Sequence, residues 1–230
     1  MGPLSAEEWS ALLLSLRVAS SAVASSLPVA VVVALVLARC RFPGKAVVDA
    51  IVHLPLVLPP VVVGWGLLML FGAEGPVGRL LFAWFGIRLV FTAEGAAVAT
   101  AVMGFPLMVR AIRLAIEAID QGLEEAARTL GAGPLDRFLT ITLPLMSPGL
   151  LAGAIIGFAA GLGEFGAVIT FVSNVPGETQ TLTLAIYTAV QSPGGERTAA
   201  RLAALSFALA LAGLIASELL ARRVRAWLGR

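Results

Sequence analysis

Residues 117–144 read EAIDQGLEEAARTLGAGPLDRFLTITLP and form the most informative stretch of the chain. Small and apolar side chains recur at helical spacing through Leu123, Ala126, Ala127 and Leu130, and charged neighbours supply polar faces. Gly131 then ends the helix. The pattern predicts a short, two-sided helix outside the membrane, suited to lie in a groove of another protein. A capped surface helix without a partner is the alternative interpretation.

Long apolar stretches flank this segment. The chain has 230 residues, of which 59% are hydrophobic and only 13% charged, and its mean hydropathy is +0.95. Soluble domains carry about 25% charged residues, so a soluble enzyme is disfavoured. We expect an all-α polytopic membrane protein, a single transmembrane domain over residues 1–230, because about 20 apolar residues make one helical span. The five predicted spans are Leu12–Ala38, Ala46–Phe71, Ala93–Ile116, Met146–Val172 and Ala200–Ala221.

The basic residues predict the orientation. Most of them lie after the first, third and fifth spans, which share one side of the membrane if the spans alternate. By the positive-inside rule, the N-terminus is then outside, the C-terminus cytoplasmic, and residues 117–145 form a cytoplasmic loop. The acidic N-terminus and the long first apolar run disfavour a cleavable signal peptide. The residues on the predicted inner side are Arg39, Arg41, Lys45, Arg110, Arg113, Arg128, Arg137, Arg222, Arg223, Arg225 and Arg230.

Two apolar segments are too short or too mixed to span. Residues Thr181–Gln191 number about a dozen, a length typical of interfacial or re-entrant helices. Residues Gly72–Thr92 predict a second interfacial segment on the outer face, with Trp84 at the level of the lipid headgroups. Either segment could equally be a loop that rests on the membrane without a function.

The cytoplasmic segment carries a spaced motif. Glu125-Ala126-Ala127 is followed after three residues by Gly131, and after nine more by Ile141, Leu143 and Pro144. This spacing resembles the EAA loop of ABC-importer permeases at every fixed position. Further stretches resemble the oxyanion branch of that family, which carries molybdate, tungstate or sulfate. They are RCRFPGK, HLPLVLPPVVVGWG, FPLMVRAIRLAIE, LGEFGAVITFVSNVPGET and the final PGGE.

The resemblance implies a type I permease fold, and its molybdate branch implies the membrane subunit of a molybdate importer. The subunit would work as a homodimer in the bacterial inner membrane. Two ATPase subunits would bind below it through the EAA loop, and a periplasmic oxyanion-binding protein would dock above. Tungstate or sulfate is the alternative cargo, because these tetrahedral dianions leave no distinguishing feature in the sequence.

The chain has no ATP site of its own. A phosphate-binding loop needs G-x-x-x-x-G-K-[ST], whereas Lys45 follows Gly44 but precedes Ala46, and Arg39 stands in place of the first glycine. No cofactor is therefore expected on the chain, and ATP is used by a partner subunit. A gradient-driven secondary transporter is the second alternative, but it predicts inverted repeats that the sequence does not display. The net charge of +2 is too small to suggest a nucleic-acid partner.

Several residues are candidates for the translocation path or its gate. Glu164 lies within the fourth predicted span, where a carboxylate costs about 2.5–3.5 kcal/mol and usually faces a cavity or a partner. We expect it to be hydrogen-bonded or paired with Arg17 or Arg110, as part of a gate. Serine hydroxyls in the first span could contact the oxyanion or could bond back to their own helix. The candidates are Gly163, Glu164, Phe165, Ser21, Ser25, Pro59 and Pro60.

Two further patterns have structural interpretations. Gly149, Gly153, Gly157 and Gly161 form a stripe that predicts close helix packing, either within one subunit or along the dimer axis. The prolines of the second span predict a kink or a hinge. His53 is the sole histidine and has no companions for metal ligation, so no metal site is predicted.

Overall fold

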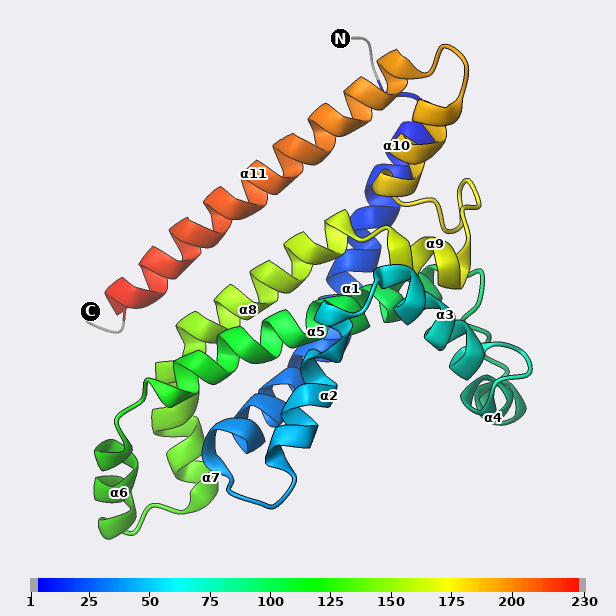
Figure 1. Cartoon of the computed structure of the whole chain (residues 1–230). Coiled ribbons are helices and arrows are strands. Elements are labelled where there is room, and N and C mark those ends of the chain that lie inside the picture. Colours follow the sequence, from blue (N-terminus) through cyan, green and yellow to red (C-terminus); the bar gives the residue numbers. More distant parts are fainter. Residues whose placement is uncertain (1–3, 228–230) are drawn as a thin grey trace.

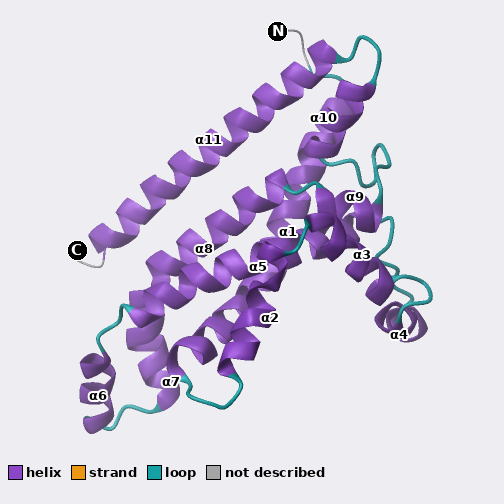
Figure 2. Cartoon of the chain, in the orientation of Figure 1, coloured by secondary structure: helices purple, strands orange, loops and turns teal. Residues whose placement is uncertain are grey.

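The computed structural model describes residues 4–227, except for some α11 side chains (214, 217–218, 220–222 and 224–227). The described residues form helices joined by short loops (Figures 1 and 2). In chain order the helices are α1 (Ala6–Arg39), α2 (Lys45–Val57), α3 (Pro60–Phe71), α4 (Pro76–Phe85), α5 (Ala93–Glu117), α6 (Gln121–Thr129), α7 (Pro134–Arg137), the π-helical turn η1 (Phe138–Thr142), α8 (Leu143–Gly163), α9 (Gly166–Val172), α10 (Leu182–Gln191) and α11 (Glu196–Trp227).

Three long helices form the centre of the bundle. α1, α5 and α8 pack on one another, and their shared core contains Ala30 and Ala34 of α1, Val109 and Ile112 of α5 and Met146 of α8. The glycine stripe lies in this contact: a Cβ at Gly153 would approach the Met108 carbonyl oxygen to 3.3 Å, and one at Gly161 would meet Thr100 at 2.7 Å. The stripe therefore packs α8 against α5 and α1 within one subunit. Small residues at these positions let the backbones approach closely.

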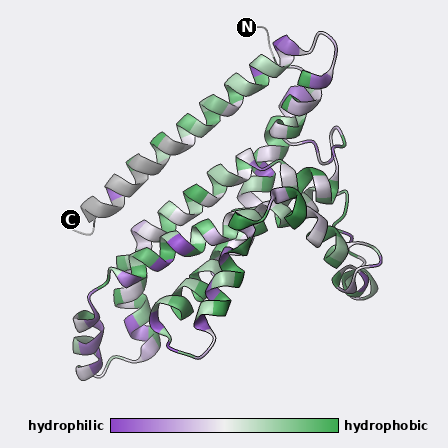
Figure 3. Cartoon of the chain, viewed as in Figure 1, coloured by the Kyte–Doolittle hydropathy of each residue, from purple (hydrophilic) through white to green (hydrophobic). Residues whose placement is uncertain are grey.

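The predicted spans correspond to the helices in part. Within residues 4–227, three helices are long and apolar enough to cross a bilayer: Ala6–Arg39, Ala93–Glu117 and the run Pro134–Gly163. The fifth predicted span lies in α11, which packs against α8 and α10. Figure 3 shows that hydrophobic residues predominate along these helices. Hydrophilic residues gather at α6 and in the turn between α1 and α2. The basic tail begins at the end of α11, where the side chains of Arg222 and Arg225 and all of Arg230 lie outside the described residues.

Two of the predicted spans are broken. The prolines of the second span predicted a kink, and the structure has one there, whereas the expectation of a continuous fourth span was wrong. The second predicted span is divided at Leu58–Pro59 into α2 and α3, whose axes are bent by 114°. Pro59 and Pro60 remove two N–H donors at successive positions, so the α2 ladder cannot continue and a new helix starts with proline in its first turn. The fourth predicted span is divided at Glu164 and Phe165, where α8 ends and the short α9 begins.

Both short apolar segments contain a helix. α10 occupies the 181–191 segment and contacts α1, where its Leu182 N–H donates to the Ser15 hydroxyl at 2.6 Å. α4 occupies part of the 72–92 segment, and the Trp84 side chain is 75% exposed.

An ion pair joins the N-terminal helix to the C-terminal helix. The Glu8 carboxylate of α1 lies 2.7 Å from the Arg201 guanidinium of α11.

Candidate functional site

Helix α6 is built by its own caps. The Asp120 carboxylate accepts a hydrogen bond from the Gly122 N–H at 2.8 Å, which supplies a partner for one of the free N–H groups of the first turn. At the other end Gly131 has φ +90°, a left-handed conformation that other residues adopt only with strain. The Ala132 N–H then donates to the Ala127 carbonyl at 3.0 Å. The predicted termination at Gly131 is therefore confirmed.

One face of α6 is attached to the bundle. The Glu124 carboxylate accepts hydrogen bonds from the Arg39 guanidinium at 2.8 Å and from the Thr142 hydroxyl at 3.1 Å. Arg39 is the last residue of α1 and Thr142 the last of η1, so one carboxylate ties α6 to two elements. Sequence analysis missed this role because the paired residues are far apart along the chain and no local spacing connects them.

The other face of α6 is uncovered (Figure 1). Glu125 and Ala126 are exposed, whereas Ala127 is half-buried. Large apolar side chains lie in the same segment with little cover: Leu123 is 47% exposed, Leu130 87% and Leu135 of α7 70%. Contiguous exposed apolar surface rimmed by charge is typical of protein–protein interaction sites. We call this surface, formed by Leu123, Glu125, Ala126, Leu130 and Leu135, the α6 face.

The spaced motif is divided between two places. Glu125 and Ala126 lie on the α6 face, and Gly131 is the turn that ends the helix. Ile141 lies in the π-helical turn, while Leu143 and Pro144 begin α8, and all three are half-buried. The second half of the motif thus connects the exposed helix to the start of a long apolar span.

The two broken spans meet each other. α3 and α9 pack together, and a Cβ at Gly64 of α3 would lie 2.6 Å from the Ala167 carbonyl oxygen. A Cβ at Gly166 would lie 2.7 Å from the Pro60 Cβ. Both glycines therefore allow a contact that a larger residue would prevent. We call this contact between the starts of α3 and α9 the break junction.

Glu164 lies beside the break junction and is not paired with any arginine whose side chain the structure describes. Its carboxylate accepts the Ala167 N–H at 2.9 Å, which caps the start of α9. Its carbonyl accepts the Thr183 hydroxyl of α10 at 2.9 Å, and the Phe165 ring lies 5.0 Å from the Tyr187 ring of the same helix. The expected hydrogen bonding of the carboxylate is confirmed, and the expected position inside a continuous helix was wrong.

The proposed arginine partners of Glu164 have other surroundings. Arg17 of α1 pairs with Glu94 of α5 at 2.9 Å, and both side chains are more than 60% exposed. Arg110 lines a cavity between α2 and α5. The suggested pairing of Glu164 with Arg17 or Arg110 was therefore wrong. No spacing rule connects Arg17 with Glu94, since they lie on different helices.

The serine candidates bond to their own helix. The Ser21 hydroxyl donates to the Arg17 carbonyl at 2.7 Å, and the Ser25 hydroxyl donates to the Ala22 carbonyl at 3.1 Å. This is the alternative that sequence analysis left open. Both residues are exposed on α1, and their contact with an oxyanion stays a prediction, as do the gate roles of Gly163, Phe165, Pro59 and Pro60.

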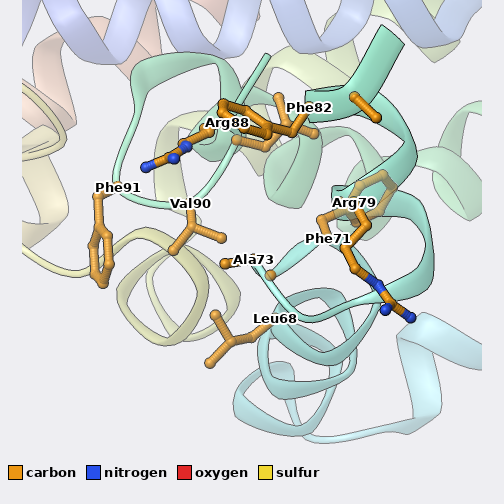
Figure 4. A pocket seen from close by; sticks show the side chains of 12 residues that line it. Leu68, Phe71, Ala73, Arg79, Phe82, Arg88, Val90 and Phe91 are labelled. Atoms are coloured by element: carbon orange, nitrogen blue, oxygen red, sulfur yellow. The ribbon is translucent and has the colours of Figure 1, made fainter. Parts of the chain in front are cut away.

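A larger cavity of about 790 Å³ lies between α3, α4 and the loop before α5 (Figure 4). Its lining is mainly apolar, with Leu68, Phe71 and Val90 among the residues around it. The Arg79 and Arg88 side chains point in different directions in Figure 4, and the Arg88 guanidinium lies 4.4 Å from the centre of the Phe82 ring. The two cations therefore do not converge on one anion.

Apolar helices that are broken where α3 meets α9, together with an exposed helix α6 tied to the ends of α1 and η1, belong to an integral-membrane transport subunit of the ABC-permease class. The family model for the binding-protein-dependent transport system inner membrane component matches residues 26–226. The chain belongs to this family.

Curated relatives and solved structures agree with this assignment. The molybdenum transport system permease protein ModB of Escherichia coli (strain K12) is 58% identical over 223 residues, 97% of each chain. The sulfate transport system permease protein CysT of Salmonella typhimurium is 41% identical over 158 residues, 69% of this chain and 57% of the relative. The fold matches a bacterial alginate ABC transporter that was solved in complex with an alginate pentasaccharide-bound periplasmic protein. The TM-score is 0.77 and the sequence identity 20%, and the match covers 96% of this chain and 80% of that chain.

Proposed function

We propose that two copies of this chain form the pathway by which molybdate enters a bacterial cell, powered by two separate ATP-binding-cassette subunits. The observation that carries the proposal is the identity of 58%, over nearly the whole of both chains, with a molybdenum transport permease. The sulfate permease matches a smaller part of the chain at lower identity. A periplasmic oxyanion-binding protein would deliver the cargo to the outer side.

The proposed mechanism is alternating access. ATP binding brings the two ATPase subunits together, and each carries one α6 face with it. Because Glu124 ties α6 to α1 and η1, this displacement moves the cytoplasmic ends of the central helices. Packed helices of this kind change between discrete arrangements by rigid-body shifts. The pathway between the two copies then opens outward to receive the anion.

The cargo is tested by competition in cells. In a strain that lacks its own molybdate permease, we expect the complete transport system to restore uptake of radioactive molybdate at nanomolar concentration. Excess tungstate should compete, because it has the same charge and nearly the same size, whereas equal sulfate should compete weakly. Strong competition by sulfate and none by tungstate would assign the chain to sulfate transport instead.

The orientation is tested with the single native cysteine. Cys40 caps the C-terminus of α1, is exposed, and lies next to basic residues that predict a cytoplasmic position. A membrane-impermeant maleimide should label Cys40 in inside-out vesicles but not in intact spheroplasts, and Cys40→Ala should abolish the labelling. Labelling from the outside of spheroplasts would reverse the proposed topology.

A further inference from the structure

Helix α2 is held weakly by packing. None of its residues is buried, and α5 is its main neighbour. Among the described residues, the polar side-chain contact between α2 and α5 is one ion pair, Arg113 Nη1 to Asp49 Oδ1 at 3.0 Å. A helix with so little buried surface follows its neighbour mainly through such a specific contact.

The geometry of Arg113 favours a fixed contact. Its Nε donates to the Glu117 carboxylate at 2.8 Å, one turn further along the same helix, which orients the guanidinium toward α2. The three side chains are 26–41% exposed. Partial burial lowers the local dielectric and strengthens the attraction relative to a surface pair. The three residues line a cavity of about 320 Å³ with His53 and Arg110.

The pair lies between the two functional parts of the chain. On one side, α5 ends four residues after Arg113, and only Ala118–Asp120 separate it from α6. Ile119 in this connection is 7% exposed and packs in the core, so the connection is not a free linker. On the other side, α2 continues through Leu58–Pro59 into α3, which forms the break junction with α9.

From this placement we infer that Arg113 and Asp49 are positioning residues for transport, which link displacement of the coupling helix α6 to movement of the broken α2–α3 span. This inference rests on the proposed ATP-driven import. Without the pair, α5 and α6 would still respond to the ATPase subunits, but α2 and α3 would no longer follow. ATP would then be hydrolysed without a matching movement of molybdate.

The test is the amount of molybdate transported per ATP hydrolysed, measured in proteoliposomes with the ATPase subunits and the binding protein. Asp49→Asn should lower this ratio about tenfold, within the usual range of coupling between sites, and leave ATP hydrolysis within about twofold of the wild type. Glu117→Gln is the matched control. It removes the charge of the other partner of Arg113 but keeps an amide oxygen that can accept from the Arg113 Nε–H, so the guanidinium stays oriented toward Asp49. The ratio should stay within about twofold of the wild type.

A triple variant separates a link from an effect of unpaired charge. Asp49→Asn combined with Arg113→Gln and Glu117→Gln removes all three charges of the contact, so damage from an unbalanced charge would be relieved. We expect the triple variant to be as uncoupled as Asp49→Asn. Recovery of wild-type coupling in the triple variant, or a ratio in Asp49→Asn equal to that in Glu117→Gln, would overturn the inference. If the wild-type complex transported molybdate without ATP, the proposed function would fail and this link with it.

Discussion

Replacing Glu125 with lysine should abolish ATP-driven molybdate uptake while the permease remains in the membrane at the wild-type level. Glu125 is exposed on the α6 face and has no hydrogen bond or ion pair among the described residues, so the fold does not depend on it. Loss of one partner of a buried charge pair in an interface costs about 2–5 kcal/mol, and a like charge in its place adds repulsion. That cost corresponds to binding that is weaker by about 30-fold or more.

The measurement for Glu125→Lys is co-purification of the ATPase subunit together with uptake. Glu74→Lys is a matched control, because Glu74 is also exposed but lies in the turn between α3 and α4, far along the chain from α6. The control should retain the ATPase subunit. If Glu125→Lys retained both the ATPase subunit and wild-type uptake, the α6 face would not be the coupling surface.

Replacing the neighbouring Glu124 with glutamine should have a different effect. Glu124 faces the bundle, and its substitution removes the ion pair with Arg39 and weakens the bond from Thr142. Hydrogen bonds to a charged group contribute about 1.5–3 kcal/mol. Because the α6 face stays intact, the ATPase subunit should still bind and hydrolyse ATP, while uptake falls at least about tenfold through loss of the rigid attachment.

Hydrogen exchange of residues 121–129 measures this attachment directly. Amides of α6 should exchange faster in Glu124→Gln than in the wild type, and Thr142→Val, which removes only the longer bond, should have the smaller effect. Loss of ATPase binding in Glu124→Gln with retention in Glu125→Lys would exchange the roles assigned to the two glutamates.

The helical class and the coupling segment could be predicted from local sequence. The lengths of the apolar stretches predict helices such as α5, which the structure places at Ala93–Glu117 against an expected Ala93–Ile116. The α6 helix and its end at Gly131 follow from small-residue spacing and from glycine at the C-terminus. Both features depend on residues within a few turns of each other.

The continuity of the spans and the long-range pairs could not be predicted. The length of an apolar stretch indicates whether it can cross a bilayer. A straight helix and a helix pair bent by 114° can have the same apolar stretch, so the stretch alone does not distinguish them. The prolines of the second span predict that the helix is kinked there, but they do not predict the angle of the kink. The pairs Arg39–Glu124 and Arg113–Asp49 join residues on different helices, so only the packing of the bundle brings them together.

The central claim is that this chain transports only when a separate ATPase drives it through α6. Its most direct test is molybdate accumulation in proteoliposomes that contain the permease and the binding protein, with and without the ATPase subunit and ATP. Accumulation against the gradient should require both the ATPase subunit and ATP, and Glu125→Lys should remove it. Uphill accumulation by the permease alone, driven by an ion gradient, would contradict the claim.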